Sequence, residues 1–159
     1  MTGTLSAPVQ LSTKETAAAL RQALKIAFPA VKFSVRKGTG TASAWIDVSY
    51  TDGPSEDRVR EITAGFQSQQ FDGSIDGYNA VRTLVEVAGK GWCRPCCSGI
   101  ITVRHLSDRF RQRAAEQVAA FYGIDIPAAE WHNAYIPQAG TWFGSLVHQA
   151  AHDRTRFAR

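Results

Sequence analysis

Two stretches of alternating apolar and polar residues constrain the fold of this chain most. In residues 31–36, valine and phenylalanine alternate with lysine, serine and arginine, and residues 44–50 show the same alternation. Successive side chains of a strand point to opposite faces, so each stretch predicts a strand with one buried face. The connecting residues 37–41 contain two glycines. Because a short glycine-bearing connection favours antiparallel neighbours, the two strands are predicted to pair as a hairpin.

Apolar residues at helical spacing predict helices on both sides of this hairpin. The first helix begins with the capping-box pattern of Ser12 and Glu15 and continues with a stripe at Ala17, Leu20, Leu24 and Phe28. The other expected elements are a helix after Ser55, strands at 81–87 and 101–103, a helix from Ser107 to Gly123, and a last helix over 142–150. The predicted order is α-β-β-α-β-β-α-α. It indicates an α+β fold with a four-stranded antiparallel sheet and helices packed on one face.

Length and composition are those of one ordinary globular domain. The chain has 159 residues, of which 44% are hydrophobic and 20% charged. We expect residues 11–159 to form a single domain after a disordered lead-in over residues 1–10. No run of about 18 apolar residues occurs, so no transmembrane helix is expected. The first residues lack the basic and apolar regions of a signal peptide, and a cytoplasmic location is therefore expected.

Several short blocks occur in an order that resembles a known family. The blocks are Lys14-Glu15-Thr16, Phe28-Pro29, Phe33-Ser34-Val35-Arg36, Thr51-Asp52-Gly53-Pro54, and Phe71-Asp72-Gly73 with Asp76. Together they resemble the large polyvalent protein-associated domains of phages and conjugative plasmids, in particular class 29. The resemblance covers residues 11–106 and leaves residues 107–159 as a helical C-terminal part.

This resemblance implies a gene carried by a mobile genetic element. It also implies a role in accompanying or protecting incoming DNA against host defences. The family supplies no catalytic residues that could be assigned to positions of this chain. Residues 89–97 and the segment after Gly123 do not fit the family pattern, so any function located there is specific to this protein.

Three clustered cysteines are the strongest local signal for chemistry. Trp92-Cys93-Arg94-Pro95-Cys96 resembles the W-C-x-P-C redox motif, in which a cysteine at a helix N-terminus has a lowered pKa. The residues that follow read as a strand, and the required strand–helix–strand context is missing. Redox catalysis is therefore not expected, although a thiol-dependent enzyme stays an alternative.

The same cysteines, with two histidines, also suggest a metal site. Cys93 and Cys96 have the C-x₂-C spacing of zinc ligands, and His148 and His152 stand four residues apart on the last helix. The separation of the two pairs is far longer than in a zinc finger. Buried free cysteines and solvated histidines explain the pattern better, so no cofactor is expected and zinc is kept as an alternative. Gln149 replaces the glutamate that an H-E-x-x-H peptidase needs as a general base.

Basic and aromatic residues suggest a surface that binds a macromolecule. The net charge is +4 and the pI about 9.2, values that fit a nucleic-acid-binding protein without requiring one. The candidate binding residues are Arg36, Lys37, Trp45, Arg104, Arg109, Arg111, Arg113 and Trp131, with further arginines at 154, 156 and 159. A row of arginines is also what a solvated surface looks like.

The leading hypothesis is a non-enzymatic accessory protein of a phage or plasmid. It would act stoichiometrically as an anti-CRISPR or anti-restriction inhibitor by binding a host defence protein or ribonucleoprotein complex. The second hypothesis is a module that binds incoming DNA or RNA directly. The third is a zinc- or thiol-dependent enzyme. A membrane partner is not expected.

Overall fold

The computed structural model describes residues 7–126, 131–153 and 157, and these residues form two compact units. The first unit spans Met1–Arg104 and the second His105–Arg159. Each unit has its own cluster of buried apolar side chains. No helix among the described residues is long and apolar enough to cross a bilayer. That the chain unfolds as one domain stays a prediction, and most of the expected lead-in lies outside the described residues.

The first unit begins with helix α1, which the sequence predicted correctly. α1 spans Thr13–Ala27, and Ser12 is its N-cap. The Ser12 hydroxyl accepts a hydrogen bond from the Glu15 amide at 3.3 Å, and the Glu15 carboxylate accepts one from the Ser12 amide at 2.9 Å. This reciprocal capping box satisfies two amides that the first turn would otherwise leave unpaired.

The predicted hairpin is also present. Strand β2 (Ser34–Lys37) pairs antiparallel with β3 (Trp45–Thr51), and Val35 lies opposite Val48. The short 3-10 helix η1 (Gly40–Ala42) connects them. In this register the buried side chains of both strands lie on one face.

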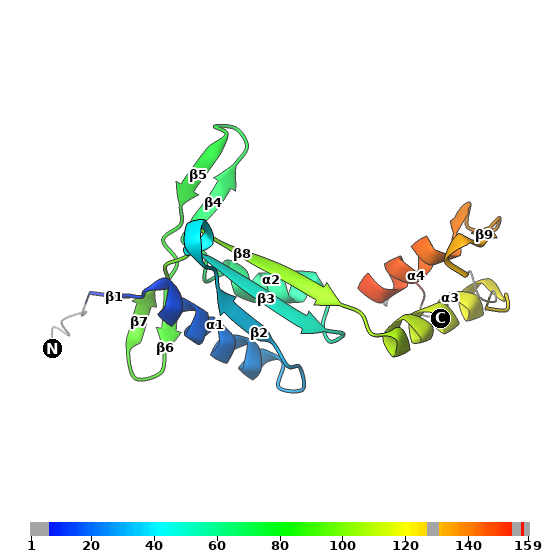
Figure 1. The fold of residues 1–159 in the computed structure, drawn as a ribbon, viewed down its shortest axis with the longest axis horizontal. Helices are drawn as coiled ribbons and strands as arrows, with labels where there is room; N and C mark the ends of the chain where they lie inside the picture. Colours follow the sequence, from blue (N-terminus) through cyan, green and yellow to red (C-terminus); the bar gives the residue numbers. More distant parts are fainter. Residues whose placement is uncertain (1–6, 127–130, 154–156, 158–159) are drawn as a thin grey trace, which may run out of the picture. The chain divides into compact units, whose positions relative to one another are not determined.

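The predicted four-stranded antiparallel sheet is wrong. The sheet that contains the hairpin has three strands in the order β2-β3-β8, where β8 is Gly99–His105. β8 runs parallel to β3, because Ser98 bonds Ala44 at the start of both strands and Arg104 bonds Asp52 at their end. Figure 1 shows the two arrows pointing the same way. The sheet is therefore mixed.

The expected strand at 81–87 belongs to a different sheet. Only Val85–Val87 of this segment form a strand, β6, which pairs antiparallel with β7 (Gly91–Arg94), and β1 (Val9–Gln10) adds to β7 in parallel. The reason is local. Gly89 and Gly91 adopt positive φ angles of 77° and 72°, which lets the chain reverse tightly and pair with itself.

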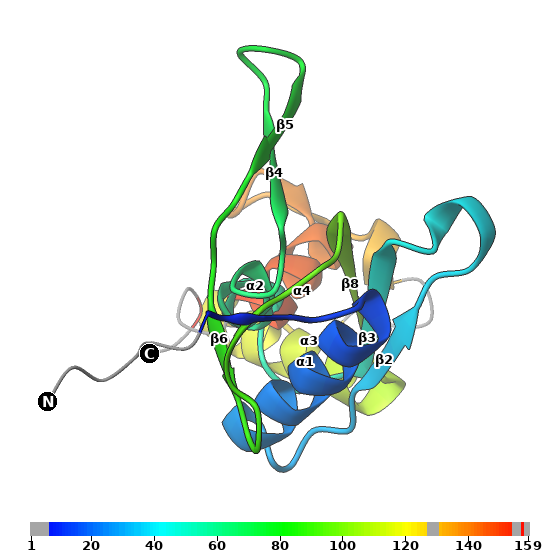
Figure 2. The same ribbon diagram turned by 90° about the vertical axis from the view of Figure 1, so that its left-hand side faces the viewer.

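Residues 69–80, for which no strand was predicted, form a further hairpin. Strands β4 (Gln69–Asp72) and β5 (Gly77–Ala80) pair antiparallel with Phe71 opposite Tyr78. Figures 1 and 2 show this hairpin projecting from the first unit. We call residues 69–80 the arm.

Two helices cover one face of the three-stranded sheet, whereas the two predicted C-terminal helices belong to the second unit. α1 and α2 (Glu56–Ala64) lie on the same side of β2, β3 and β8 in Figure 2. The fully buried side chains of this core come from both layers and include Leu20, Leu24, Ile46, Val48 and Val59.

The second unit is mainly helical. α3 (Asp108–Tyr122) begins at the predicted cap, where the Ser107 hydroxyl accepts from the Phe110 amide at 3.2 Å, and ends at Gly123 in the left-handed conformation. After α3, the described residues include the 3-10 helix η2 (Trp131–Asn133) and a two-stranded ribbon of β9 (Tyr135–Ile136) and β10 (Thr141–Trp142). α4 (Phe143–His152) packs against α3.

Candidate functional site

The cysteine motif lies in an extended segment and not at a helix N-terminus. Cys93 is on β7, and the chain after Cys96 enters β8, as the sequence predicted. Cys93 and Cys97 are buried, whereas Cys96 is exposed. The Cys97 thiol donates to the Phe66 carbonyl at 3.1 Å, and burial raises its pKa to about 11. A thiol with a raised pKa is a poor nucleophile at neutral pH, because the thiolate is the reactive form.

Only one of the three thiols is expected to react quickly in the folded protein. Titration with a thiol-specific chromogenic reagent at neutral pH should give one fast equivalent from exposed Cys96, and the other two only after unfolding. Cys96→Ser should abolish the fast phase. Two or more fast equivalents in the native protein would contradict the burial of Cys93 and Cys97.

The proposed zinc ligands do not form a set of three in the described part of the chain. No group of three or more histidine, cysteine, aspartate or glutamate side chains is close enough there to hold a metal ion. Cys93 and Cys96 lie in the first unit, and His148 and His152 in the second. The two histidines are brought together on α4, with ring centroids 4.4 Å apart.

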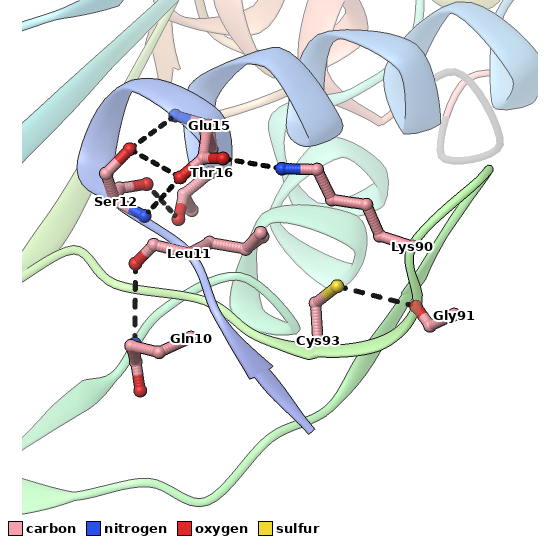
Figure 3. Close-up of polar contacts among 8 residues, drawn as sticks. All are labelled: Gln10, Leu11, Ser12, Glu15, Thr16, Lys90, Gly91 and Cys93. Carbon is pink, nitrogen blue, oxygen red and sulfur yellow. Dashed lines mark hydrogen bonds and ion pairs between the residues drawn. The ribbon is translucent and has the colours of Figure 1, made fainter. Parts of the chain in front are cut away.

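A polar cluster fastens the β6–β7 hairpin to the start of α1 (Figure 3). The Lys90 ammonium donates to the Glu15 carboxylate at 2.5 Å. This bond, together with those from Ser12, lowers the pKa of Glu15 to about 2. The Thr16 hydroxyl accepts from the Cys96 amide at 2.9 Å and donates to the Ser12 carbonyl. These contacts join elements about 80 residues apart in the sequence. The cluster therefore serves to hold the fold together.

The predicted basic residues do not form one row. Arg36 and Lys37 are exposed at the end of β2. The Arg104 guanidinium donates to the carbonyls of Asp52 and Gly53 at 3.0 and 3.1 Å, so it holds the turn after β3.

The three arginines of α3 are exposed but point in different directions. Arg109 and Arg113 are four residues apart and share a side of the helix, while Arg111 lies about 200° around the axis from each of them. Arg111 also lies 3.5 Å from the Asp108 carboxylate. The pair Arg109 and Arg113 is therefore what α3 could offer to a phosphate backbone.

The two tryptophans predicted as exposed anchors are half-buried. Trp45 lies over Gly99, where a Cβ atom would come within 2.4 Å of its ring. Trp131 packs edge-on against buried Phe143, with centroids 5.9 Å apart. Both therefore serve packing. Trp92 and Trp142, by contrast, are 60% and 52% exposed.

The arm presents an apolar surface that sequence reasoning missed. Phe71, Ile75 and Tyr78 are 55%, 62% and 57% exposed, and the two rings meet edge-to-face at 5.4 Å. At the turn, the Asp72 carboxylate accepts from the Ser74 amide and hydroxyl and from the Asn79 side chain at 2.6–2.9 Å. The Ser74 contacts are the main cause of the lowered pKa of Asp72. The alternation around Asp-Gly-Ser-Ile-Asp-Gly was the available signal for a hairpin.

A family model, large polyvalent protein associated domain 29, matches residues 11–107. The chain belongs to this family. No curated protein and no solved structure matches this chain. The large polyvalent protein associated domain thus ends close to the boundary between the two units, and most of the second unit lies outside the match.

Membership associates the protein with phages and other mobile elements. Within the large polyvalent protein associated domain, three of the five sequence blocks that carry the resemblance fall at distinct structural features. Glu15 and Thr16 of the first block belong to the polar cluster at α1, Thr51-Asp52-Gly53-Pro54 forms the turn held by Arg104, and Phe71-Asp72-Gly73 lies within the arm. The first two features stabilise the fold, whereas the arm leaves its apolar side chains in solvent.

Proposed function

We propose that this protein is a stoichiometric anti-defence factor of a mobile element, which binds a host defence protein through the arm. The supporting observation is the exposed group Phe71, Ile75 and Tyr78 on a projecting hairpin. Contiguous apolar side chains exposed on a protein surface are typical of interaction sites. Phenylalanine and tyrosine have few rotatable bonds, so they bury large areas at a small entropic cost.

The charge of the arm favours a particular kind of partner. Residues 69–80 contain Asp72 and Asp76 but no lysine or arginine. These carboxylates would repel the phosphates of a nucleic acid and attract a basic surface. Nucleases and CRISPR ribonucleoproteins hold nucleic acid in positively charged channels. An acidic hairpin with an aromatic flank therefore fits the rim of such a channel.

Truncating the aromatic side chains of the arm should weaken the complex without destabilising the protein. We expect Phe71→Ala and Tyr78→Ala each to lower affinity for the defence protein by about 30-fold, the effect of a binding hot spot. Trp92→Ala is the matched control, because Trp92 is 60% exposed on a different hairpin.

The measurement is binding to purified restriction nucleases and CRISPR effector complexes of the host, by biolayer interferometry, with inhibition of the bound enzyme as a second readout. Thermal unfolding of each variant checks the fold. Equal loss in Trp92→Ala, or full affinity in both arm variants, would exclude the arm as the anchor.

Direct nucleic-acid binding is the second candidate, favoured by the exposed pair Arg109 and Arg113 on α3. Each phosphate contact should contribute about 0.9 log units of affinity loss per tenfold rise in salt on duplex DNA. Arg109→Ala and Arg113→Ala should then each reduce that slope by about one contact. Under our proposal, binding to plain duplex at physiological salt stays in the non-specific range of about 10⁻⁴ to 10⁻⁶ M. A nanomolar, steeply salt-dependent affinity would favour this second candidate.

We propose no catalytic role. Cys97 is buried with a raised pKa, and Cys93 is buried on a strand. A disulfide reductase activity that disappears in Cys93→Ser would support the alternative of a thiol-dependent enzyme, and stoichiometric bound zinc would support a metal-dependent one.

A further inference from the structure

Strand β8 forms an open edge of the three-stranded sheet. It spans Gly99–His105 and pairs with β3 on one side, and no other strand of the described residues pairs with its far side. Ile101 and Val103, on its outer face, are 48% and 43% exposed. A long edge strand with exposed β-branched side chains is a template for another strand unless charges or a covering segment protect it.

The alternation of odd- and even-numbered residues along β8 identifies the backbone groups that face the open edge. The Ser98 amide donates to the Ala44 carbonyl at 2.7 Å at the start of the parallel β3–β8 pair. In a parallel ladder, every second residue directs both its N–H and its C=O to the neighbouring strand. The even-numbered residues of β8 therefore face β3, and the N–H and C=O groups of Ile101 and Val103 face outward.

A trough lies beside this edge. It has a volume of about 440 Å³ and is lined by Arg60, Thr63 and Ala64 of α2, by Gln67, and by residues 100–102 of β8. The Thr102 hydroxyl oxygen is buried at this position and has no hydrogen-bond partner among the residues that the structure describes. A buried hydroxyl without a partner costs free energy, and a polar side chain placed in the trough would remove that cost.

We propose that β8 accepts an extended segment of a partner protein as a fourth strand of the sheet. The backbone of the segment pairs with Ile101 and Val103. Alternate side chains of the segment then lie on opposite faces. β-branched side chains on one face extend the apolar surface of Ile101 and Val103. Small hydroxyl or amide side chains on the other face enter the trough and bond the Thr102 hydroxyl.

Two features favour an extended protein segment over a nucleic acid or a second copy of this chain as the occupant of this edge. Outward N–H and C=O groups that recur at every second residue match the repeat of another extended peptide and not that of a nucleic acid. A second copy of this chain would pair its β8 antiparallel about a two-fold axis normal to the sheet. Both copies of α2, which lines the trough beside β8, would then be crowded together on the same face. A single extended segment avoids that crowding. The proposal uses none of the arm residues, so it does not rest on the anti-defence function.

The test uses the full chain and an acetylated, amidated heptapeptide of alternating threonine and valine, which matches the length of β8. Amide hydrogen exchange followed by NMR should show protection of the Ile101 and Val103 amides when peptide is added at up to about 1 mM. A peptide with methyl groups on all internal backbone nitrogens keeps the side chains but cannot donate. It should bind at least about tenfold more weakly.

A protein variant provides the reciprocal test. Val103→Pro removes the outward N–H and should weaken peptide binding by about tenfold or more, because that amide is not used in the pairing with β3. Val103→Thr keeps both the amide and the β-branched shape, so it should bind within about twofold of the wild type. Circular dichroism checks the fold. If Val103→Pro does not fold, the exchange and methylated-peptide measurements on the wild type still decide.

Three results would overturn the proposal. The first is no protection at Ile101 and Val103 at the highest peptide concentration, or equal binding of the methylated peptide. The second is protection without peptide that rises with protein concentration, which would identify a second copy as the occupant. The third is protection of the same amides by a short oligonucleotide, which would identify nucleic acid.

Discussion

Leu24→Ala is expected to lower the free energy of unfolding of the first unit by about 2–5 kcal/mol, the range measured for emptying buried leucine sites. Leu24 is 0% exposed near the C-terminal end of α1 and belongs to the core that also contains Ile46, Val48 and Val59. Removing its isobutyl group loses the hydrophobic contribution of that group. It also leaves a cavity that the sheet cannot fully close.

The matched control is Ile26→Ala on the same helix. Ile26 is 72% exposed, so its truncation should change stability by less than about 0.5 kcal/mol. Urea unfolding followed by far-ultraviolet circular dichroism measures both. A loss below about 1 kcal/mol for Leu24→Ala, or similar losses for the two variants, would show that this stripe of α1 does not face the core.

Elements that depend on neighbouring residues could be predicted from the sequence. The capping box of Ser12 and Glu15, the apolar stripe of α1 and the β2–β3 hairpin are all encoded within short windows. The same holds for α3, with its serine cap and its terminal Gly123. Each of these is fixed by local hydrogen bonding and periodicity, which a single sequence contains.

The pairing of distant strands could not be predicted in this way. Alternation shows which face of a strand is buried but not which strand lies beside it. β8 therefore appeared to be a fourth antiparallel strand, whereas it lies parallel to β3. Residues 85–94 fold back on themselves because Gly89 and Gly91 permit a tight reversal, and that local pairing removes them from the main sheet.

The candidate binding residues show the same difference between what a local sequence encodes and what distant packing decides. Residue type indicated that tryptophans and arginines could bind a partner, but exposure depends on packing. Gly99 leaves room for Trp45, and Phe143 contacts Trp131, so both tryptophans are half-buried. Phe71 and Tyr78 look like ordinary strand residues in the sequence. Only the projection of the arm shows that they have no core to enter.

Phe143→Ala is expected to lower the stability of the second unit by about 3–5 kcal/mol. Phe143 is 0% exposed at the start of α4, and Trp131 packs edge-on against its ring. The neighbouring Trp142 is 52% exposed and provides the control. Trp142→Ala should cost less than about 1.5 kcal/mol, the upper value for an aromatic pair such as the one it forms with Tyr135. Equal losses at the two positions would contradict the core position of Phe143.

The variants at Leu24 and Phe143 together test whether the two units unfold as one, as the sequence predicts. Trp45 and Trp92 report on the first unit, and Trp131 and Trp142 on the second. In a single cooperative transition, either substitution shifts the fluorescence midpoint of all four tryptophans equally. If the units unfold separately, Leu24→Ala moves only the transition seen by Trp45 and Trp92, and Phe143→Ala only the other. Separate transitions would mean that the family domain at residues 11–107 is stable by its own core, and that the C-terminal unit could be removed without unfolding it.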